Sequence, residues 1–209
     1  MNLSIYSEIP MHQVIEEVRK SPMLKSDTQF PYKNANISLR NVGMGEINPT
    51  SLYALKANLD FQKNLREYIL NRFGFDTLRL SSGLILENKD GERQTLIPPI
   101  VEVSEREVKF IPQKDELSYE NSYKIKIPCL LDGIHRALCA KELGIDLNVI
   151  FIYDSDTNYP VYAHPNEWDL VKICDSIPKE KSQKKMYLRD DHSSLYKSFA
   201  HLGSSGLRK

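Results

Sequence analysis

With 209 residues, the chain is long enough for one domain with a well-buried core. Its 28 basic and 28 acidic side chains give a formal net charge of zero, which argues against broad, non-specific binding of nucleic acid but leaves a local basic patch open. No apolar run approaches the roughly 18–20 residues that are needed to cross a membrane.

The start of the chain and its cysteines bear on the cellular setting. The first residues, "MNLSIYSEIPMHQVIEEVRK", lack the apolar core of a secretory signal. The cysteines Cys129, Cys139 and Cys174 are few, odd in number and spaced unlike a pair of zinc ligands. We therefore predict a cytoplasmic protein in a reducing setting, with no membrane contact.

Two helical segments are predicted in the first part of the chain, separated by a polar stretch that contains proline. Residues 1–35 form an N-terminal extension with one short helix in "MHQVIEEVRK" (11–20). After it, leucine and isoleucine recur at helical spacing in "NPTSLYALKANLDFQKNLREYILNRFG" (48–74). This spacing predicts a long or broken helix that begins near Pro49 and closes at Gly74.

The middle of the chain is predicted to be a sheet. Residues 78–127 alternate in the manner of strands, and Asp90-Gly91 has the chemistry of a hairpin turn. A strand in "YKIKIPCLL", a short helix in "IHRALCAKEL" and a buried strand in "LNVIFIY" follow. We expect this unit to be βαβ, with its two strands parallel and joined in the right-handed sense. The predicted fold class is α/β, or α+β if the sheet is mixed.

The last part of the chain, residues 154–209, is rich in loop-forming residues, with short helical signals near 166–174 and 191–202. The basic run "PKEKSQKK" within it is typical of a solvated linker. We predict an extension that packs on the main domain.

The junction "LLDGIHRALC" carries the chemistry of the chain. It places His135 and Arg136 at the start of the predicted helix, where exposed N–H groups disfavour cations by roughly 0.3–1 kcal/mol per charge. A bound anion would make this placement favourable, because the backbone N–H groups of Gly133, Ile134 and His135 can form a phosphate pocket. Arg136 can add a bidentate fork and His135 a second donor.

The same residues allow a second interpretation. Asp132 and Arg136 are four residues apart and can pair across the first helical turn, with Asp132 capping the helix and His135 facing water. Spacing alone leaves both interpretations open.

The motif "DGIHRALCAKELGI" resembles the signature helix of the ParB/sulfiredoxin-like superfamily, whose members carry Asp-Gly-His-His-Arg, Gly-Glu-Arg-Arg or a related form at this strand–helix junction. Upstream, "LIPPIVEV" (96–103) resembles the superfamily's recurrent short strand with Pro-Ile-Val. The resemblance covers residues 36–153 and implies a mixed-sheet ParB/sulfiredoxin-like domain there, followed by the helical, loop-rich extension.

What the superfamily does narrows the chemistry. Its helix start typically cradles nucleotide phosphates, and its activities include CTP binding and hydrolysis, ATP-dependent sulfinic acid reduction and phosphorylation of free serine. Sulfiredoxins need a reactive cysteine where this chain has Ile134, which excludes that reaction. The Asp-Gly-x-His-Arg form is matched by Asp132, Gly133, His135 and Arg136.

The resemblance also implies roles for single residues. Asp132 would coordinate Mg²⁺ or orient a phosphate-bound water, with an N-cap role as the alternative. In the serine-kinase branch a glutamate ahead of the first long helix acts as the base, and Glu46 holds the nearest position. Glu46 therefore joins Asp132 and His135 as a catalytic candidate, with a surface-loop role as its alternative. Arg40, just ahead of it, can help to bind phosphate.

We therefore predict an Mg²⁺-dependent enzyme that binds ATP or CTP and hydrolyses the terminal phosphate or transfers it to a small hydroxyl compound. The first alternative is a DNA-associated factor or nuclease of a DNA-modification, defence or partition system, which the zero net charge does not favour. The second is a non-catalytic nucleotide sensor. The sequence leaves the nucleotide base, the acceptor and the formation of a homodimer open.

Overall fold

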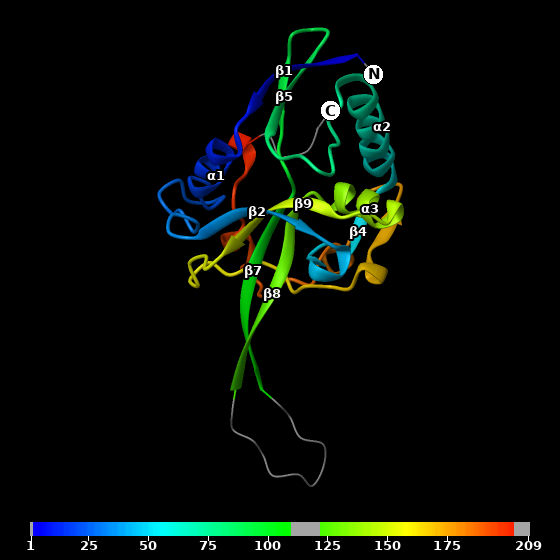
Figure 1. Cartoon of the computed structure of the whole chain (residues 1–209). Coiled ribbons are helices and arrows are strands. Elements are labelled where there is room, and N and C mark those ends of the chain that lie inside the picture. Colours follow the sequence, from blue (N-terminus) through cyan, green and yellow to red (C-terminus); the bar gives the residue numbers. More distant parts are fainter. Residues whose placement is uncertain (1, 110–121, 203–209) are drawn as a thin grey trace.

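The computed structural model describes residues 2–109 and 122–202. Its centre is a five-stranded mixed sheet with the strand order β2-β9-β7-β8-β3 (Figure 1). These strands are β2 (Asn36–Val42), β9 (Leu147–Tyr153), β7 (Ile100–Lys109), β8 (Ser122–Asp132) and β3 (Asn48–Pro49). The predicted α+β class with a mixed sheet is confirmed. No helix within the described ranges is long and apolar enough to cross a membrane.

The strands β8 and β9 are antiparallel and are not neighbours. β7 lies between them, and it pairs antiparallel with β8 and parallel with β9. The predicted parallel βαβ unit is therefore wrong. That prediction used only the order of elements along the chain, whereas the earlier strand β7 takes the place between them by pairing Ile100, Val101 and Glu102 with residues 150–152.

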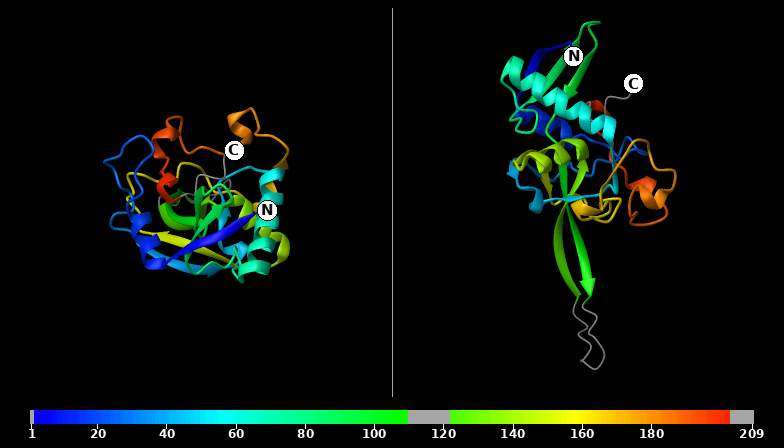
Figure 2. Two further views of the ribbon diagram at one scale, coloured as in Figure 1. Left: turned by 90° about the horizontal axis from the view of Figure 1, so that it is seen from above. Right: turned by 90° about the vertical axis from the view of Figure 1, so that its right-hand side faces the viewer.

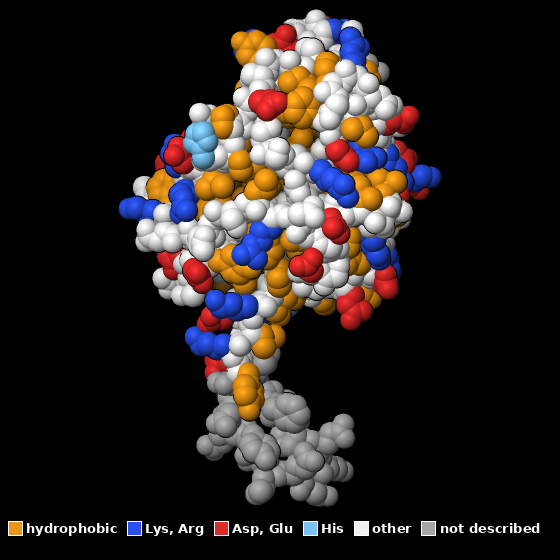
Figure 3. Space-filling view, in the orientation of Figure 1, with side chains coloured by type: hydrophobic (Ala, Val, Ile, Leu, Met, Phe, Trp, Pro, Cys, Tyr) orange, Lys and Arg blue, Asp and Glu red, His pale blue; other side chains and the backbone are white. Residues whose placement is uncertain are grey.

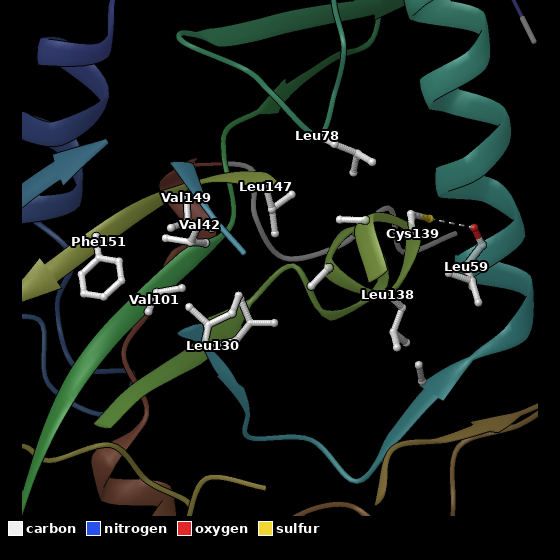
Figure 4. Close-up of a cluster of buried hydrophobic side chains, with 14 of the residues drawn as sticks. Val42, Leu59, Leu78, Val101, Leu130, Leu138, Cys139, Leu147, Val149 and Phe151 are labelled. Carbon is white, nitrogen blue, oxygen red and sulfur yellow. Dashed lines mark hydrogen bonds between the residues drawn. The ribbon is translucent and has the colours of Figure 1, made fainter. Parts of the chain in front are cut away.

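Different helices cover the two faces of the sheet. The helices are α1 (Met11–Arg19), α2 (Lys56–Phe73) and α3 (Ile134–Leu143). α2 and α3 lie on one face, where Val149 and Phe151 of β9 enter a shared core (Figure 4). α1 covers the opposite face, over Ile150 and Ile152. Because successive side chains of a strand point to opposite faces, β9 is apolar along an unbroken run.

A smaller sheet packs against Leu65 and Ile69 of α2. It consists of β1 (Leu3–Ile9), β5 (Gly83–Asn88) and β6 (Arg93–Leu96), in the order β1-β5-β6. The predicted hairpin is confirmed, because β5 and β6 pair antiparallel on either side of Gly91, which has a φ of 79°. β1 and α1 come from the range predicted as an N-terminal extension, and both pack against the rest of the domain.

The long helix ends where the sequence predicts but begins later. Gly74 closes α2 with a φ of 78°, and its N–H donates to the carbonyl of Leu70. The helix begins at Lys56, because the preceding residues form β3 and then β4 (Tyr53–Leu55). β4 pairs in parallel with β10 (Lys172–Cys174), so a tertiary contact overrides the helical spacing near Pro49.

The C-terminal part packs as loops and 3₁₀ turns around the side of the domain on which α2 begins (Figure 2). The turns are η2 (Trp168–Leu170), η3 (Lys181–Gln183), η4 (His192–Leu195) and η5 (Ala200–Leu202), and η1 (Met44–Glu46) precedes β3. The predicted helical pieces are thus 3₁₀ turns and the strand β10. Trp168 fixes this part to the domain, since its Nε1 donates to the carbonyls of Met44 and Ile47.

Candidate functional site

The helices α2 and α3 run side by side in the same direction. At their starts, the N–H of Leu55 donates to Nε2 of His135 at 3.1 Å. One turn further along both helices, the thiol of Cys139 donates to the carbonyl of Leu59 (Figure 4). Another turn on, Lys63 forms an ion pair with Glu142. The matched steps show that the two helices run in the same sense and that their N-termini adjoin.

Two adjoining N-termini concentrate positive potential at one place. The N–H groups of a helix's first turn have no acceptor within the helix, and each helix start carries roughly +0.5 of an elementary charge. The N-cap residues Leu55 and Gly133 make no side-chain hydrogen bond to the first turn of α2 or α3. The arrangement therefore favours an anion that spans both helix starts, and phosphate oxygens suit the N–H donors.

The turn into α3 depends on Gly133. This residue is the N-cap, with a φ of 94° and a ψ of 23°, whereas the sequence reading gives the N-cap role to Asp132. Pro99 lies directly against it, so that a Cβ atom at position 133 would meet the Pro99 Cβ at 2.6 Å. The segment "LIPPI" and the strand–helix junction are thus packed on each other.

Asp132 and Arg136 form the local pair that the spacing allows. Arg136 is buried, its Nη1 donates to the carbonyl of Ile97, and its Nη2 lies 3.8 Å from Oδ2 of Asp132. Burial lowers the pKa of Arg136 and raises the pKa of Asp132, and the attraction between the two charges opposes both shifts. Arg136 therefore has internal partners where the sequence predicts an external phosphate.

His135 links the two helix starts. Its Nε2 accepts the Leu55 N–H, so the ring is neutral and carries its hydrogen on Nδ1. Burial lowers the pKa of this histidine. The sequence predicts His135 as a second cation at the helix start. In the structure its ring is neutral, and its hydrogen bond to Leu55 fixes the position of β4 and α2 relative to α3.

The neutral ring of His135 predicts a pH dependence of folding. Its pKa in the folded state lies below the ordinary value of about 6.5 that it takes in the unfolded chain. Its stabilising contribution is therefore present above that value and is lost as the pH falls below it. We expect the free energy of unfolding in urea to fall more between pH 7.5 and 5.5 in the wild type than in His135→Gln.

The matched control for this experiment is His164→Gln, which replaces an exposed histidine. It should lose stability with acid as steeply as the wild type. His135→Ala, which leaves the Leu55 N–H without its acceptor, should cost about 1–3 kcal/mol at pH 7.5. An acid response of His135→Gln equal to that of the wild type would contradict the assignment.

Comparison with known proteins decides the family. The family model described as the ParB CE domain matches residues 13–173, which is well over half of the chain. The chain belongs to the ParB CE domain family. No curated protein and no solved structure matches it. The match begins within α1 and ends within β10, and it therefore includes residues 36–153.

Glu46 lies away from the helix starts of this ParB CE domain. Its Oε1 accepts the Gly43 N–H at 2.7 Å and closes the turn η1. The strand that follows pairs Asn48 with Cys129, three residues before Asp132, so Glu46 lies further back along β8. The structure therefore does not bring Glu46 and Asp132 together.

Arg40 also lies elsewhere. It belongs to the edge strand β2, which β9 and β7 separate from β8. Its Nη1 donates to the hydroxyl of Tyr153 at 2.7 Å, and its guanidinium lies over the rings of Phe151 and Tyr153. This arginine stabilises an aromatic pair on the edge of the sheet.

The sequence reading missed the side chains that the C-terminal part contributes. Lys185 donates to the hydroxyl of Tyr162 at 2.6 Å, and its charge acts on Asp132 to lower the pKa of that carboxyl against the effect of burial. The adjacent carbonyl of Lys184 accepts the N–H of Leu52, just before β4. The basic run read as a solvated linker therefore borders the start of α2.

The side chains at the helix starts suit an Mg²⁺ ion that is held mainly by the phosphates of a bound substrate. Within residues 2–109 and 122–202, no three side chains of His, Cys, Asp or Glu gather as a metal site. Mg²⁺ usually keeps several waters and takes one or two carboxylates together with substrate phosphates. Asp132 is the carboxylate at the helix starts that can serve in this way.

Proposed function

We propose that this ParB CE domain binds a nucleoside triphosphate, ATP or CTP, through its phosphates at the adjoining starts of α2 and α3. The observation that carries the proposal is that the starts of α2 and α3 adjoin, joined by the hydrogen bond between Leu55 and His135, while neither N-cap side chain bonds to the first turn of its helix. Lys185 adds a cation from the C-terminal part, and Lys56 adds an exposed one at the first position of α2.

The second part of the proposal is that the domain hydrolyses the terminal phosphate or transfers it to a hydroxyl. Asp132 is the carboxylate beside the phosphates, and its raised pKa suits it to accept a proton. Mg²⁺ carried by the phosphates would neutralise part of their charge, with Asp132 as the protein group able to reach it directly or through water. Arg136 acts as a positioning residue that holds Asp132.

Nucleotide titration tests the proposal. ATP, CTP and GTP are titrated by calorimetry with Mg²⁺ and with EDTA, and phosphate release is followed in parallel. Lys185→Glu should weaken binding by about tenfold or more, because it places a like charge beside the phosphates. Lys89→Glu, which makes the same change of net charge on the β5–β6 turn, should bind as the wild type does.

The outcomes separate the rival functions. Equal dissociation constants for Lys185→Glu and Lys89→Glu would contradict the phosphate site, and binding without turnover would leave a nucleotide sensor. Retention of DNA in low salt would support a DNA-associated factor. On the described part of the face in Figure 3, basic and acidic side chains are interspersed, which does not favour that alternative.

A further inference from the structure

A cavity of about 230 Å³ opens beside Asp132, on the side where the C-terminal part crosses the end of β8. Its walls are mostly apolar and aromatic. They come from Leu24, from Leu131 at the end of β8, and from Tyr162, Tyr196 and Phe199 of the C-terminal part. The rings of Tyr162 and Tyr196 lie 4.4 Å apart, so two aromatic side chains form one continuous wall.

Two charged side chains, Lys197 and Asp132, reach the cavity, and every hydrogen of the Lys197 ammonium already has an acceptor. The ammonium of Lys197 is bonded to Glu102 and to the carbonyls of Tyr159 and Pro160, which uses its three hydrogens. The side chain of Asp132 is 28% exposed, and Nη2 of its cationic partner Arg136 lies 3.8 Å from its Oδ2. Ser198 also lines the cavity. A guest therefore meets mainly apolar and aromatic walls, with one serine and one carboxylate.

We propose that this cavity holds the acceptor of the phosphoryl transfer and that the acceptor is a phenol, a hydroxyl carried on a flat apolar ring. This inference rests on the proposed function. The walls suit a ring, and the carboxylate of Asp132 suits a single hydroxyl donor. A free amino acid would bring two charges into a cavity that offers one carboxylate, which costs desolvation free energy.

The position of the cavity favours an acceptor over a nucleotide base. Asp132 lines the cavity and directly precedes Gly133, the N-cap of the phosphate-binding helix, and consecutive Cα atoms are about 3.8 Å apart. In a nucleoside triphosphate, the ribose and two further phosphates separate the base from the terminal phosphate. The distance between the cavity and the start of α3 is too short to hold them. An acceptor hydroxyl, by contrast, must lie next to the terminal phosphate.

The transfer step then balances as follows. The phenol oxygen forms a bond to the terminal phosphorus, and the bond from that phosphorus to the bridging oxygen breaks. The nucleoside diphosphate leaves with the electron pair of that bond. The phenol proton passes to the carboxylate of Asp132, which lines the cavity.

Binding of p-cresol to the full chain without nucleotide tests the cavity by itself. We expect p-cresol to bind about tenfold more tightly than toluene, which lacks the hydroxyl, and Asp132→Asn to remove the difference. Ala200→Trp, a change at an exposed position that lines the cavity, should abolish binding. Leu170→Trp, at an exposed position on η2, is the matched control and should bind normally.

The second measurement tests the acceptor role. With ATP or CTP, Mg²⁺ and p-cresol, phosphorus NMR should show 4-methylphenyl phosphate, and free serine should give no phosphoserine. Equal affinity for p-cresol and toluene, binding by Ala200→Trp, or bound nucleotide and bound p-cresol without aryl phosphate would each overturn the inference. Failure of the nucleotide to bind would overturn the proposed function. Because p-cresol binding is measured without nucleotide, it tests the cavity separately from the proposed function.

Discussion

Replacing Gly133 with alanine is expected to destabilise the domain by about 3 kcal/mol or more, measured as the free energy of unfolding in urea. Two costs add up at this position. A φ of 94° lies in the left-handed region, which costs a residue with a Cβ roughly 1–2 kcal/mol. The new Cβ would also lie 2.6 Å and 2.8 Å from the Cβ and Cγ of Pro99, and overpacking typically costs a further 1–3 kcal/mol.

Gly144→Ala is the matched control for this prediction. Gly144 closes the other end of α3 with a φ of 64°, and a Cβ there meets nothing within 4 Å. It should therefore cost only the backbone strain, about 1–2 kcal/mol. If the two variants lose the same stability, the contact between Pro99 and the start of α3 does not hold the junction as described.

The junction could be predicted from the sequence because its contacts are local. The glycine between strand and helix, the helix start at Ile134 and the pairing of Asp132 with Arg136 all follow from spacing within a few residues. The spacing allowed two partners for Arg136, the carboxylate of Asp132 or a bound phosphate. Burial next to the carbonyl of Ile97 decided between them, and burial depends on the whole fold.

The side chains around Asp132 could not be predicted in the same way. Tyr162 and Lys185 follow it far along the chain, in a segment without helical or strand periodicity, and pairing of β4 with β10 brings that segment to the start of α2. The same limit explains the wrong βαβ prediction, since the position of β7 in the sheet is a long-range choice. The basic run that contains Lys185 has no sequence pattern that indicates its proximity to Asp132.

A buried ion pair holds the segment that walls the cavity. Glu102 in β7 and Lys197 in the C-terminal part have side chains that are each 1% exposed, and their charged atoms lie 3.1 Å apart. The carboxylate also accepts hydrogen bonds from the hydroxyls of Tyr32 and Ser155. Removing either partner leaves an uncompensated charge inside the protein, which typically costs about 3–5 kcal/mol.

Lys197→Met is therefore expected to lower the free energy of unfolding by about 3–5 kcal/mol, and Glu102→Gln by a similar amount. The double variant should be less destabilised than the sum of the two, because neither charge then remains without its partner. Urea unfolding of the four proteins measures the coupling. Additive losses would mean that the two side chains act independently.

The exposed pair of Glu105 and Lys124 is a control that separates the effect of burial on stability from the effect of the distance between the charges. Its charged atoms lie closer, at 2.7 Å, yet the side chains are 37% and 73% exposed. Water screens such a pair, so Lys124→Met should leave the free energy of unfolding nearly unchanged. A Lys197→Met variant that folds should also bind p-cresol more weakly than the wild type does, because the loss of its bonds to Glu102 and to the carbonyls of Tyr159 and Pro160 releases the wall formed by Tyr196 and Phe199.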